Sequence, residues 1–178
     1  PKAPALIATL KQRGIEPIMI TGDQHEAAHV VADQLGISTF HAQTLPADKA
    51  NLVKALQQSH GTTAFLGDGV NDAPAMAQAD VGIAIGTGSD IAIESSDVVL
   101  VSGDPAGVLV VQKLAQATMA NSKQNLIWAF GYNVILIPVA AGVLVPFGFG
   151  MLNPMLAGAA MAISSICVVT NALRLRRA

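Results

Sequence analysis

The sequence predicts an α/β fold with a parallel sheet, followed by a two-helix transmembrane hairpin. In the first part of the chain, short apolar runs alternate with segments of helical periodicity. From Gln124 through Leu173 the 178-residue chain contains no Asp, Glu, Lys, Arg or His. A loop rich in Asp and Gly, Gly67–Pro74, directly follows one apolar run, where open α/β sheets place their ligands. The chain is therefore expected to have two regions of different chemistry.

The composition agrees with two such regions. Hydrophobic residues make up 52% and charged residues 12% of the chain, and the mean hydropathy is +0.50. These values are too apolar for a wholly soluble protein. The net charge of −2 and the 4% of aromatic residues provide no basic surface, so nucleic acid is not expected as a partner. The single cysteine, Cys167, cannot form an internal disulfide.

Residues 1–104 are expected to form the α/β part. Helical spacing of apolar residues predicts a helix over 4–13, which Gly14 ends. We expect further helices over 24–35, over 46–58 and from Asn71, and short strands at 17–20, 38–41, 62–66, 81–85 and 97–101. Strands that alternate with helices pair in parallel through right-handed crossovers. The prediction is a doubly wound sheet whose strand-to-helix loops share one edge.

Polar residues suited to binding a phosphate gather on that edge. Asp68 and Asp72 lie among glycines that let the backbone approach a ligand closely, and hard carboxylate oxygens suit a magnesium ion that meets a phosphate. Thr21, in Thr21-Gly22-Asp23, can offer a hydroxyl and a backbone N–H at the start of the next helix. Lys49 lies near the amino end of its helix, where the dipole disfavours a cation unless an anion lies ahead.

Each of these features also has a simpler interpretation. The Asp/Gly-rich loop could be a turn whose side chains bond their own backbone. Thr21 could belong to an ordinary strand-end turn, and Lys49 could be a solvated surface lysine. The stretch His25-Glu26-Ala27-Ala28-His29 matches a zinc-protease pattern, but no third ligand follows at a comparable helical position. An exposed helix face is the expected explanation of that stretch.

The uncharged stretch is long enough to cross a membrane twice, because about twenty helical residues span the hydrocarbon core. We expect a connecting helix over 105–124, transmembrane helices over 125–145 and 153–173, an external turn over 146–152 and a cytoplasmic tail over 174–178. Lys123 and three arginines of the tail flank the pair. The positive-inside rule therefore places both ends, and the α/β part, in the cytoplasm.

Few side chains within the expected spans are polar or soft. The ones that stand out are Tyr132 and Asn133 in the first span, and Met161, Ser164, Ser165 and Cys167 in the second. Met161 and Ser165 are four residues apart and share one helix face. A methionine thioether selects soft metals such as copper(I). Packing between the two helices, with Ser and Asn as hydrogen-bonding groups, is the alternative role.

Together these motifs resemble the carboxyl-terminal part of a copper(I)-transporting P-type ATPase of the heavy-metal family. Gly67–Pro74 is similar to the hinge and magnesium motif of that family's phosphorylation domain, and Thr21-Gly22-Asp23 and Pro46-Ala47-Asp48-Lys49 are similar to its phosphate motifs. The resemblance implies a partial haloacid-dehalogenase-like parallel sheet. It assigns Mg²⁺ to Asp68 and Asp72, and assigns the phosphate to Thr21, Gly22, Asp23, Lys49 and Asn71.

The membrane motifs imply the transported ion. Tyr132-Asn133 and Met161 to Ser165 are similar to motifs that mark copper or silver selectivity in the family's last two helices, so the resemblance gives Tyr132, Asn133, Met161 and Ser165 to copper. Relatives that carry zinc or cadmium usually have charged residues in these helices, and this chain has none. The resemblance thus implies an ATP-driven copper(I) or silver export pump in a bacterial membrane, with a copper chaperone as a further partner. A pump for another heavy metal is the alternative.

The sequence departs from the family by what it lacks. It contains no Asp-Lys-Thr-Gly motif, whose aspartate would be phosphorylated, and neither Thr-Gly-Glu nor Cys-Pro-Cys. We therefore expect a fragment that is inactive alone and that needs the remainder of the pump chain and a lipid bilayer. A membrane-anchored haloacid-dehalogenase-like phosphatase and a non-catalytic interaction module are the competing interpretations.

Overall fold

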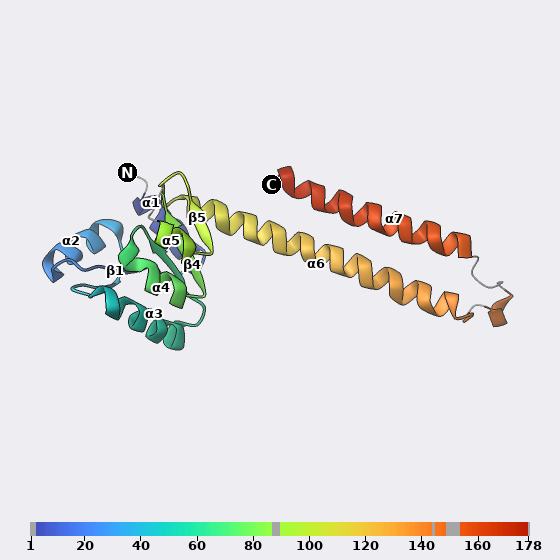
Figure 1. The fold of residues 1–178 in the computed structure, drawn as a ribbon, viewed down its shortest axis with the longest axis horizontal. Helices are drawn as coiled ribbons and strands as arrows, with labels where there is room; N and C mark the ends of the chain where they lie inside the picture. The colour runs from blue at the N-terminus through green and yellow to red at the C-terminus, as the bar shows by residue number, and fades with distance from the viewer. Residues whose placement is uncertain (1–2, 87–89, 144, 149–153, 178) are drawn as a thin grey trace. The chain divides into compact units, whose positions relative to one another are not determined.

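The computed structural model describes residues 3–86, 90–143, 145–148 and 154–177 (Figure 1). Contacts within the chain divide it into two compact units, Pro1–Val110 and Val111–Ala178. We call the first the α/β unit and the second the helical pair. No helix of the described residues is both long and apolar enough to cross a membrane.

The α/β unit alternates strands and helices, as its apolar periodicity predicts. Its elements are α1 (Ala3–Gln12), β1 (Ile18–Ile20), α2 (His25–Leu35), β2 (Thr39–His41), α3 (Pro46–His60), β3 (Ala64–Gly67), the 3-10 helix η1 (Val70–Asp72), α4 (Ala73–Gln78), β4 (Val81–Ile85), α5 (Asp90–Glu94) and β5 (Val98–Leu100). Only α5 was not anticipated, because its five residues are too few to carry a helical period. The expected α/β class with parallel pairing is confirmed.

The strands form two parallel sheets rather than the one doubly wound sheet expected. In the first sheet β1 pairs with β2, with Ile18 opposite Thr39. In the second, β4 lies between β3 and β5. Periodicity marks strands but not their partners, and the described residues contain no strand that joins β1 to β3. The expectation of one continuous sheet was therefore wrong.

The core of the second sheet lies under helix α4. Ala73, Met76 and Ala84 are buried together, and Phe65 and Val99 pack against them. The helix approaches the sheet closely at Gly82, where an added Cβ would lie 2.8 Å from the Met76 carbonyl oxygen. Glycine is thus required there to bring α4 down onto β4. This packing holds the loop between β3 and α4 in place.

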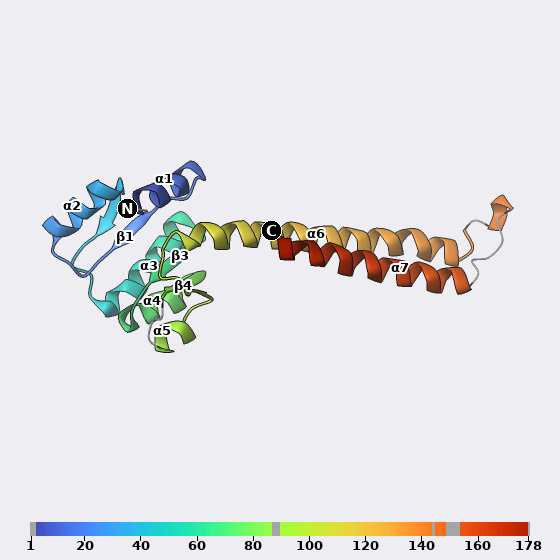
Figure 2. The same ribbon diagram turned by 90° about the horizontal axis from the view of Figure 1, so that it is seen from above.

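The helical pair consists of α6 (Gly107–Ala140, which begins in the α/β unit) and α7 (Pro154–Leu173), with 3-10 turns η2 (Val145–Phe147) and η3 (Arg174–Arg177). The two helices run antiparallel and side by side in both views (Figures 1 and 2). Most residues of the expected connecting helix (105–124) and first span (125–145) lie in one continuous helix, α6, which contains Pro138.

The two membrane spans expected at 125–145 and 153–173 are not confirmed. Helices are present, but the finding for the described residues is that none is apolar over a sufficient length. The first helix ends at Ala140, earlier than expected. A window of 18 residues that ends there must include Lys123, Gln124 and Asn125, which reduce its apolar character. Residue 153 of the second stretch and residues 149–152 of the expected external turn lie outside the described residues.

Candidate functional site at the strand ends

The loops that follow β1 and β2 are tied together by their backbones. The Thr21 N–H donates to the His41 carbonyl at 2.9 Å, which extends the pairing of the first sheet by one residue. The Thr44 N–H then donates to the Thr21 carbonyl at 3.0 Å. The carboxyl end of β1 is therefore fixed against the segment that leads into α3, the helix that carries Lys49.

Thr21 and Asp23 form a closed turn. The Thr21 hydroxyl donates to Asp23 Oδ2 at 2.8 Å and accepts the Asp23 backbone N–H at 3.1 Å. The hydroxyl proton is thus engaged with Asp23 and would have to be released before it could be donated to a ligand. Gly22 is not demanded by packing, because a Cβ there would meet only the Thr44 carbonyl at an ordinary 3.7 Å.

Lys49 and Asp72 form the central contact of the site. Lys49 lies in the first turn of α3, and its ammonium Nζ contacts Asp72 Oδ1 at 2.6 Å. Their side chains are only 14% and 13% exposed. A cation near a helix amino end is disfavoured by the helix dipole, and here the anion that offsets this cost is Asp72. The structure therefore brings together two residues that lie 23 positions apart.

Gly67 allows Asp72 to fold back over the end of β3. A Cβ at residue 67 would lie 2.6 Å from Asp72 Cβ and 2.9 Å from Asp72 Oδ2, and real side chains do not approach that closely. The Asp72 N–H also donates to the Gly69 carbonyl at 3.1 Å, which closes η1. Any side chain at residue 67 would push the Asp72 carboxylate away from Lys49.

Asp68 and Asn71 lie in the same loop but are free of such contacts. Both are exposed, and no hydrogen bond or ion pair joins either side chain to the described residues. Thr21 likewise makes no hydrogen bond to Lys49, Asp68 or Asp72 within that part of the chain. The loop therefore presents one carboxylate already paired with a cation and one carboxylate available to a ligand.

The donors suit magnesium in number and kind. Magnesium keeps several waters and is held by one or two carboxylates together with phosphate oxygens, and Asp68 and Asp72 supply two carboxylates in one short loop. The described residues hold no group of three or more His, Cys, Asp or Glu that could enclose a metal ion. The donor set fits an open magnesium site completed by water and phosphate, and does not fit an all-protein cage.

The histidine pair of α2 does not form a zinc site. The rings of His25 and His29 are 6.5 Å apart, and both pack against Phe40. His29 Nδ1 lies 3.2 Å from Asp33 Oδ2, one helical turn further on. Since no third metal ligand gathers there in the described chain, the two rings serve to pack α2 against β2.

In the helical pair, the residues expected to bind copper differ in their surroundings. The Tyr132 hydroxyl oxygen is buried and has no hydrogen-bond partner among the described residues. Asn133 is exposed and its amide donates to the Ala129 carbonyl of its own helix at 2.7 Å. Ser165 is exposed. The Met161 backbone is helical, but its side chain lies outside the described part.

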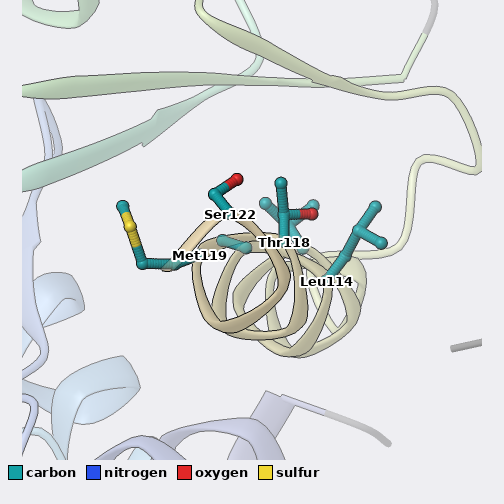
Figure 3. A pocket seen from close by; sticks show the side chains of 6 residues that line it. Leu114, Thr118, Met119 and Ser122 are labelled. Carbon is teal, nitrogen blue, oxygen red and sulfur yellow. The ribbon is translucent and has the colours of Figure 1, made fainter. Parts of the chain in front are cut away.

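A shallow hollow lies on α6 before these residues (Figure 3). It is lined by Val111, Leu114, Ala115, Thr118, Met119 and Ser122. Leu114, Thr118 and Ser122 follow one side of the helix at four-residue intervals, and Figure 3 shows Met119 pointing away from them. Every lining residue belongs to α6, so the hollow is a stripe on one helix.

Sequence reasoning missed two contributions. One is Thr44, whose backbone N–H bonds the Thr21 carbonyl and so holds the β1 loop against the segment that leads to Lys49. A backbone donor cannot be recognised from the type of side chain in the sequence. The other is a set of three asparagines, Asn121, Asn125 and Asn171, which are joined by one hydrogen bond within α6 and two between the helices. Their spacing could have revealed them, because Asn121 and Asn125 are four apart and so share a helix face.

Three comparisons identify what the chain is similar to. The family model of haloacid dehalogenase-like hydrolases matches residues 1–80. The "Probable copper-transporting ATPase PacS" of Synechocystis sp. is 55% identical over 177 residues, which is 99% of this chain and 24% of that protein. "Copper-transporting ATPase 1" of Rhizobium meliloti is 56% identical over 173 residues, which is 97% of this chain and 21% of that protein.

A solved structure agrees with the sequence matches. A zinc-transporting PIB-type ATPase in its E2.Pi state superposes with a TM-score of 0.85 at 38% identity, covering 98% of this chain and 27% of that one. The resemblance to P-type ATPases is thus confirmed over nearly the whole chain. The chain spans about a quarter of the length of these relatives.

Proposed function

We propose that this chain, which is similar to P-type ATPases over nearly its whole length, forms part of an ATP-driven copper(I) export pump. The observation that carries the proposal is the convergence of Lys49 and Asp72 on one loop, with the Asp68 carboxylate left available beside them. A structural turn would have no need of a cation held 2.6 Å from one carboxylate at the carboxyl edge of a parallel sheet. A phosphoryl-transfer site has that need.

The residues of the loop would act on a phosphoryl group by position and charge. Asp68 and Asp72 would hold magnesium, which when bound neutralises charge on the transferred group. The Lys49 ammonium, little exposed and held at its position by Asp72, would offer a cation to a phosphoryl oxygen. Thr21 would orient the same group once its hydroxyl releases Asp23, and Gly22 leaves the backbone open to close approach. Asn71 would complete the network.

The phosphorylated aspartate would come from the remainder of the pump. The sequence has no Asp-Lys-Thr-Gly motif, and the chain covers about a quarter of its relatives' length. Thr21 follows β1 and Asp68 follows β3, and the two strands belong to different sheets within the described residues. A further segment of the pump could pair there and bring its aspartate to the edge between Thr21 and Asp68.

The proposal is tested in a longer pump chain that contains this segment. Asp68→Asn should reduce magnesium-dependent phosphoenzyme formation from ATP by roughly 10²–10³-fold, the usual loss when one group that stabilises a transition state is removed. Asp80→Asn is the matched control, because Asp80 precedes β4 and so lies at the opposite edge of the sheet. Equal phosphoenzyme levels in Asp68→Asn and the parent would reject a catalytic site and favour an interaction module.

We propose copper(I) as the ion because the sequence relatives are copper ATPases by name and because no charged residue occurs from Gln124 through Leu173. Copper(I) should stimulate the ATPase of the longer pump, and Met161→Ala should weaken that stimulation. Met119→Ala, on the exposed face of α6, is the control for loss of a thioether elsewhere. Equal stimulation by zinc would show that the pump carries another metal, and the matched solved structure is that of a zinc-transporting ATPase.

We further propose that the helical pair lies in a membrane in the intact pump, with the α/β unit on the cytoplasmic side. Its large apolar side chains are exposed along both helices, and Lys123 and Arg174 flank the uncharged stretch. Trp128 is the one tryptophan of the sequence, so bilayer contact can be read from its fluorescence. Brominated lipids should quench Trp128 in reconstituted vesicles, and unchanged emission would exclude the insertion.

A further inference from the structure

The helical pair has an inner stripe on each helix. On α6 the least exposed residues from Asn121 onward recur every three or four positions, and they are Asn121, Asn125, Ala129, Tyr132, Leu136 and Val139. Among the α7 residues whose side chains are described, they are Ser164, Val168 and Asn171. Spacing of this kind is that of two helices packed along a seam. The stripes therefore mark the faces that α6 and α7 turn toward each other.

One end of this seam is closed by a ring of hydrogen bonds. Asn121 Nδ2 donates to the Asn171 carbonyl at 2.7 Å, Asn171 Nδ2 donates to Asn125 Oδ1 at 2.9 Å, and Asn125 Nδ2 donates to Asn121 Oδ1 at 3.1 Å. Each asparagine donates once and accepts once. Asn121 is only 9% exposed, although the apolar residues around it on α6 face outward. The ring is thus a closed polar unit within an apolar surface.

The ring also satisfies a backbone group that a helix end leaves without a partner. The last four carbonyls of an α-helix have no donor in their own helix, and Asn171 lies two residues before the end of α7 at Leu173. The amide of Asn121 supplies that donor from the other helix. Sliding one helix past the other would break the bonds between the helices and leave this carbonyl unpaired.

The ring fixes which residues of the two helices lie at the same level. Asn121 and Asn125 both bond Asn171, so the midpoint between them, residue 123, is level with residue 171. Ten residues onward along α6 is Asn133, and ten residues back along α7 is Met161. At 1.5 Å per residue each lies about 15 Å from the ring. A slip of one helical turn, about 5.4 Å, would separate these levels.

We propose that the ring of Asn121, Asn125 and Asn171 is a register clamp. It positions Tyr132-Asn133 on α6 level with Met161 on α7, and it contacts none of these residues itself. The role of those residues as copper ligands rests on the proposed function, whereas the register rests on the hydrogen bonds alone. The three asparagines are therefore positioning residues for the ion.

The register can be measured on this chain in detergent, with Cys167→Ser to remove the native thiol. By the register given above, residue 129 is level with residue 165, and Ser164 is the adjacent residue on the inner stripe of α7. Ala129→Cys with Ser164→Cys therefore forms an aligned pair. Ala129→Cys with Val168→Cys forms a pair shifted by one turn. A short bis-thiol reagent should link the aligned pair several-fold more than the shifted pair. In the Asn125→Leu variant, which loses one donor and one acceptor of the ring, the ratio should fall toward one.

Gln124→Leu is the matched control, because it removes the adjacent, exposed amide from the same helix and should keep the parent ratio. Circular dichroism verifies that helix content is unchanged. If Asn125→Leu does not fold, Asn125→Asp replaces it, because aspartate still accepts from Asn171 but cannot donate to Asn121, and it should give an intermediate ratio. An unchanged ratio in the folded Asn125 variant would overturn the clamp.

A second measurement separates the clamp from the proposed function. In a longer pump chain containing this segment, Asn125→Leu should raise the copper(I) concentration for half-maximal ATPase stimulation several-fold and leave the rate at saturating copper within twofold. Loss at both concentrations would indicate general misfolding and contradict a positioning role. A pump that does not respond to copper at all would reject the proposed function, while the cross-linking ratio would still decide the clamp.

Discussion

The α/β unit and the helical pair follow opposite rules of burial. In the α/β unit the most enclosed large side chain is Met76, 1% exposed, within an apolar core. Among the described residues of the helical pair, the buried one is the polar Asn121. Apolar residues of α6 are exposed instead, as at Ile127, which is 71% exposed. The first unit is held by apolar burial in water. In the second unit, hydrogen bonds join the two helices, and large apolar side chains are exposed on the surface.

The same contrast extends to the sites proposed for the two units. In the α/β unit, polar groups come from loops, and their positions are set by backbone turns and by the close approach at Gly67. In the helical pair, polar groups come from the helices themselves, so their relative level depends on the register between helices. A site built from loops is therefore disrupted by a change in a turn. A site built from two helices is disrupted when one helix slides along the other.

The largest expected effect compares one methionine from each unit. Met76→Ala should reduce the stability of the α/β unit by about 2–5 kcal/mol, because it removes a buried side chain and leaves a cavity. Met119→Ala, at a position 59% exposed on α6, should change stability by less than about 0.5 kcal/mol. Hydrogen exchange of β3 and β4 would measure the first and that of α6 the second. Equal losses would contradict the opposite burial of the two units.

The next effect tests the close approach at the site loop. Gly67→Ala should destabilise the α/β unit by about 1–3 kcal/mol, because the new Cβ would overlap the Asp72 side chain. Gly69→Ala is the matched control two residues on, where a Cβ would lie 3.9 Å from the nearest heavy atom. Urea titration followed by hydrogen exchange at 64–72 reports both. Tolerance of alanine at residue 67 would mean that the loop can relax.

Removal of the central cation should have a somewhat smaller effect. Lys49→Met leaves the little-exposed Asp72 carboxylate without its partner and should cost about 1–2 kcal/mol of stability. Lys54→Met, on an exposed position of the same helix, should be nearly neutral. Thermal unfolding of the two variants side by side gives the difference. A neutral Lys49 variant would show that the contact is not maintained in solution.

The smallest effect concerns Asp80 and its dependence on pH. Its carboxylate accepts the Thr63 N–H at 2.8 Å, and this bond lowers the pKa of Asp80 below its ordinary value of 3.8. A carboxyl whose pKa is lower in the folded state adds stability above its ordinary pKa and loses it as pH falls through the lowered value. Asp80→Asn should therefore differ from the parent at neutral pH and converge with it in strong acid. A constant difference across the acid range would exclude this bond as the cause.

Much of the α/β unit could be predicted from periodicity. Strand β4 has the bounds expected, and β1, β2, β3 and β5 lie within two residues of theirs, because short apolar runs between turn residues define buried strands. The number of sheets could not be predicted in this way. Pairing depends on which strand edges meet in space, and that information is not local in the sequence.

The site shows the same division. The residue types of Gly67–Pro74 are sufficient by themselves to indicate magnesium and phosphate chemistry. That Lys49 meets Asp72, while Asp68 stays exposed, depends on how α3 packs beside the β3 loop. For the helical pair, the lack of charged residues correctly indicated where the two long helices lie. Membrane spans of the expected bounds are not found among the described residues.

Residue type and local spacing were enough to establish the class of the first unit and the uncharged nature of the two long helices, and to predict the chemistry of its loop. These properties act over one or two turns of chain, so they can be read along it. The separation of the sheets, the partner of Lys49 and the ring that joins Asn121, Asn125 and Asn171 emerged only from the folded arrangement. Each depends on contacts between residues distant in the chain, and hydrogen-bonding side chains acquire their partners only when packing brings those segments together.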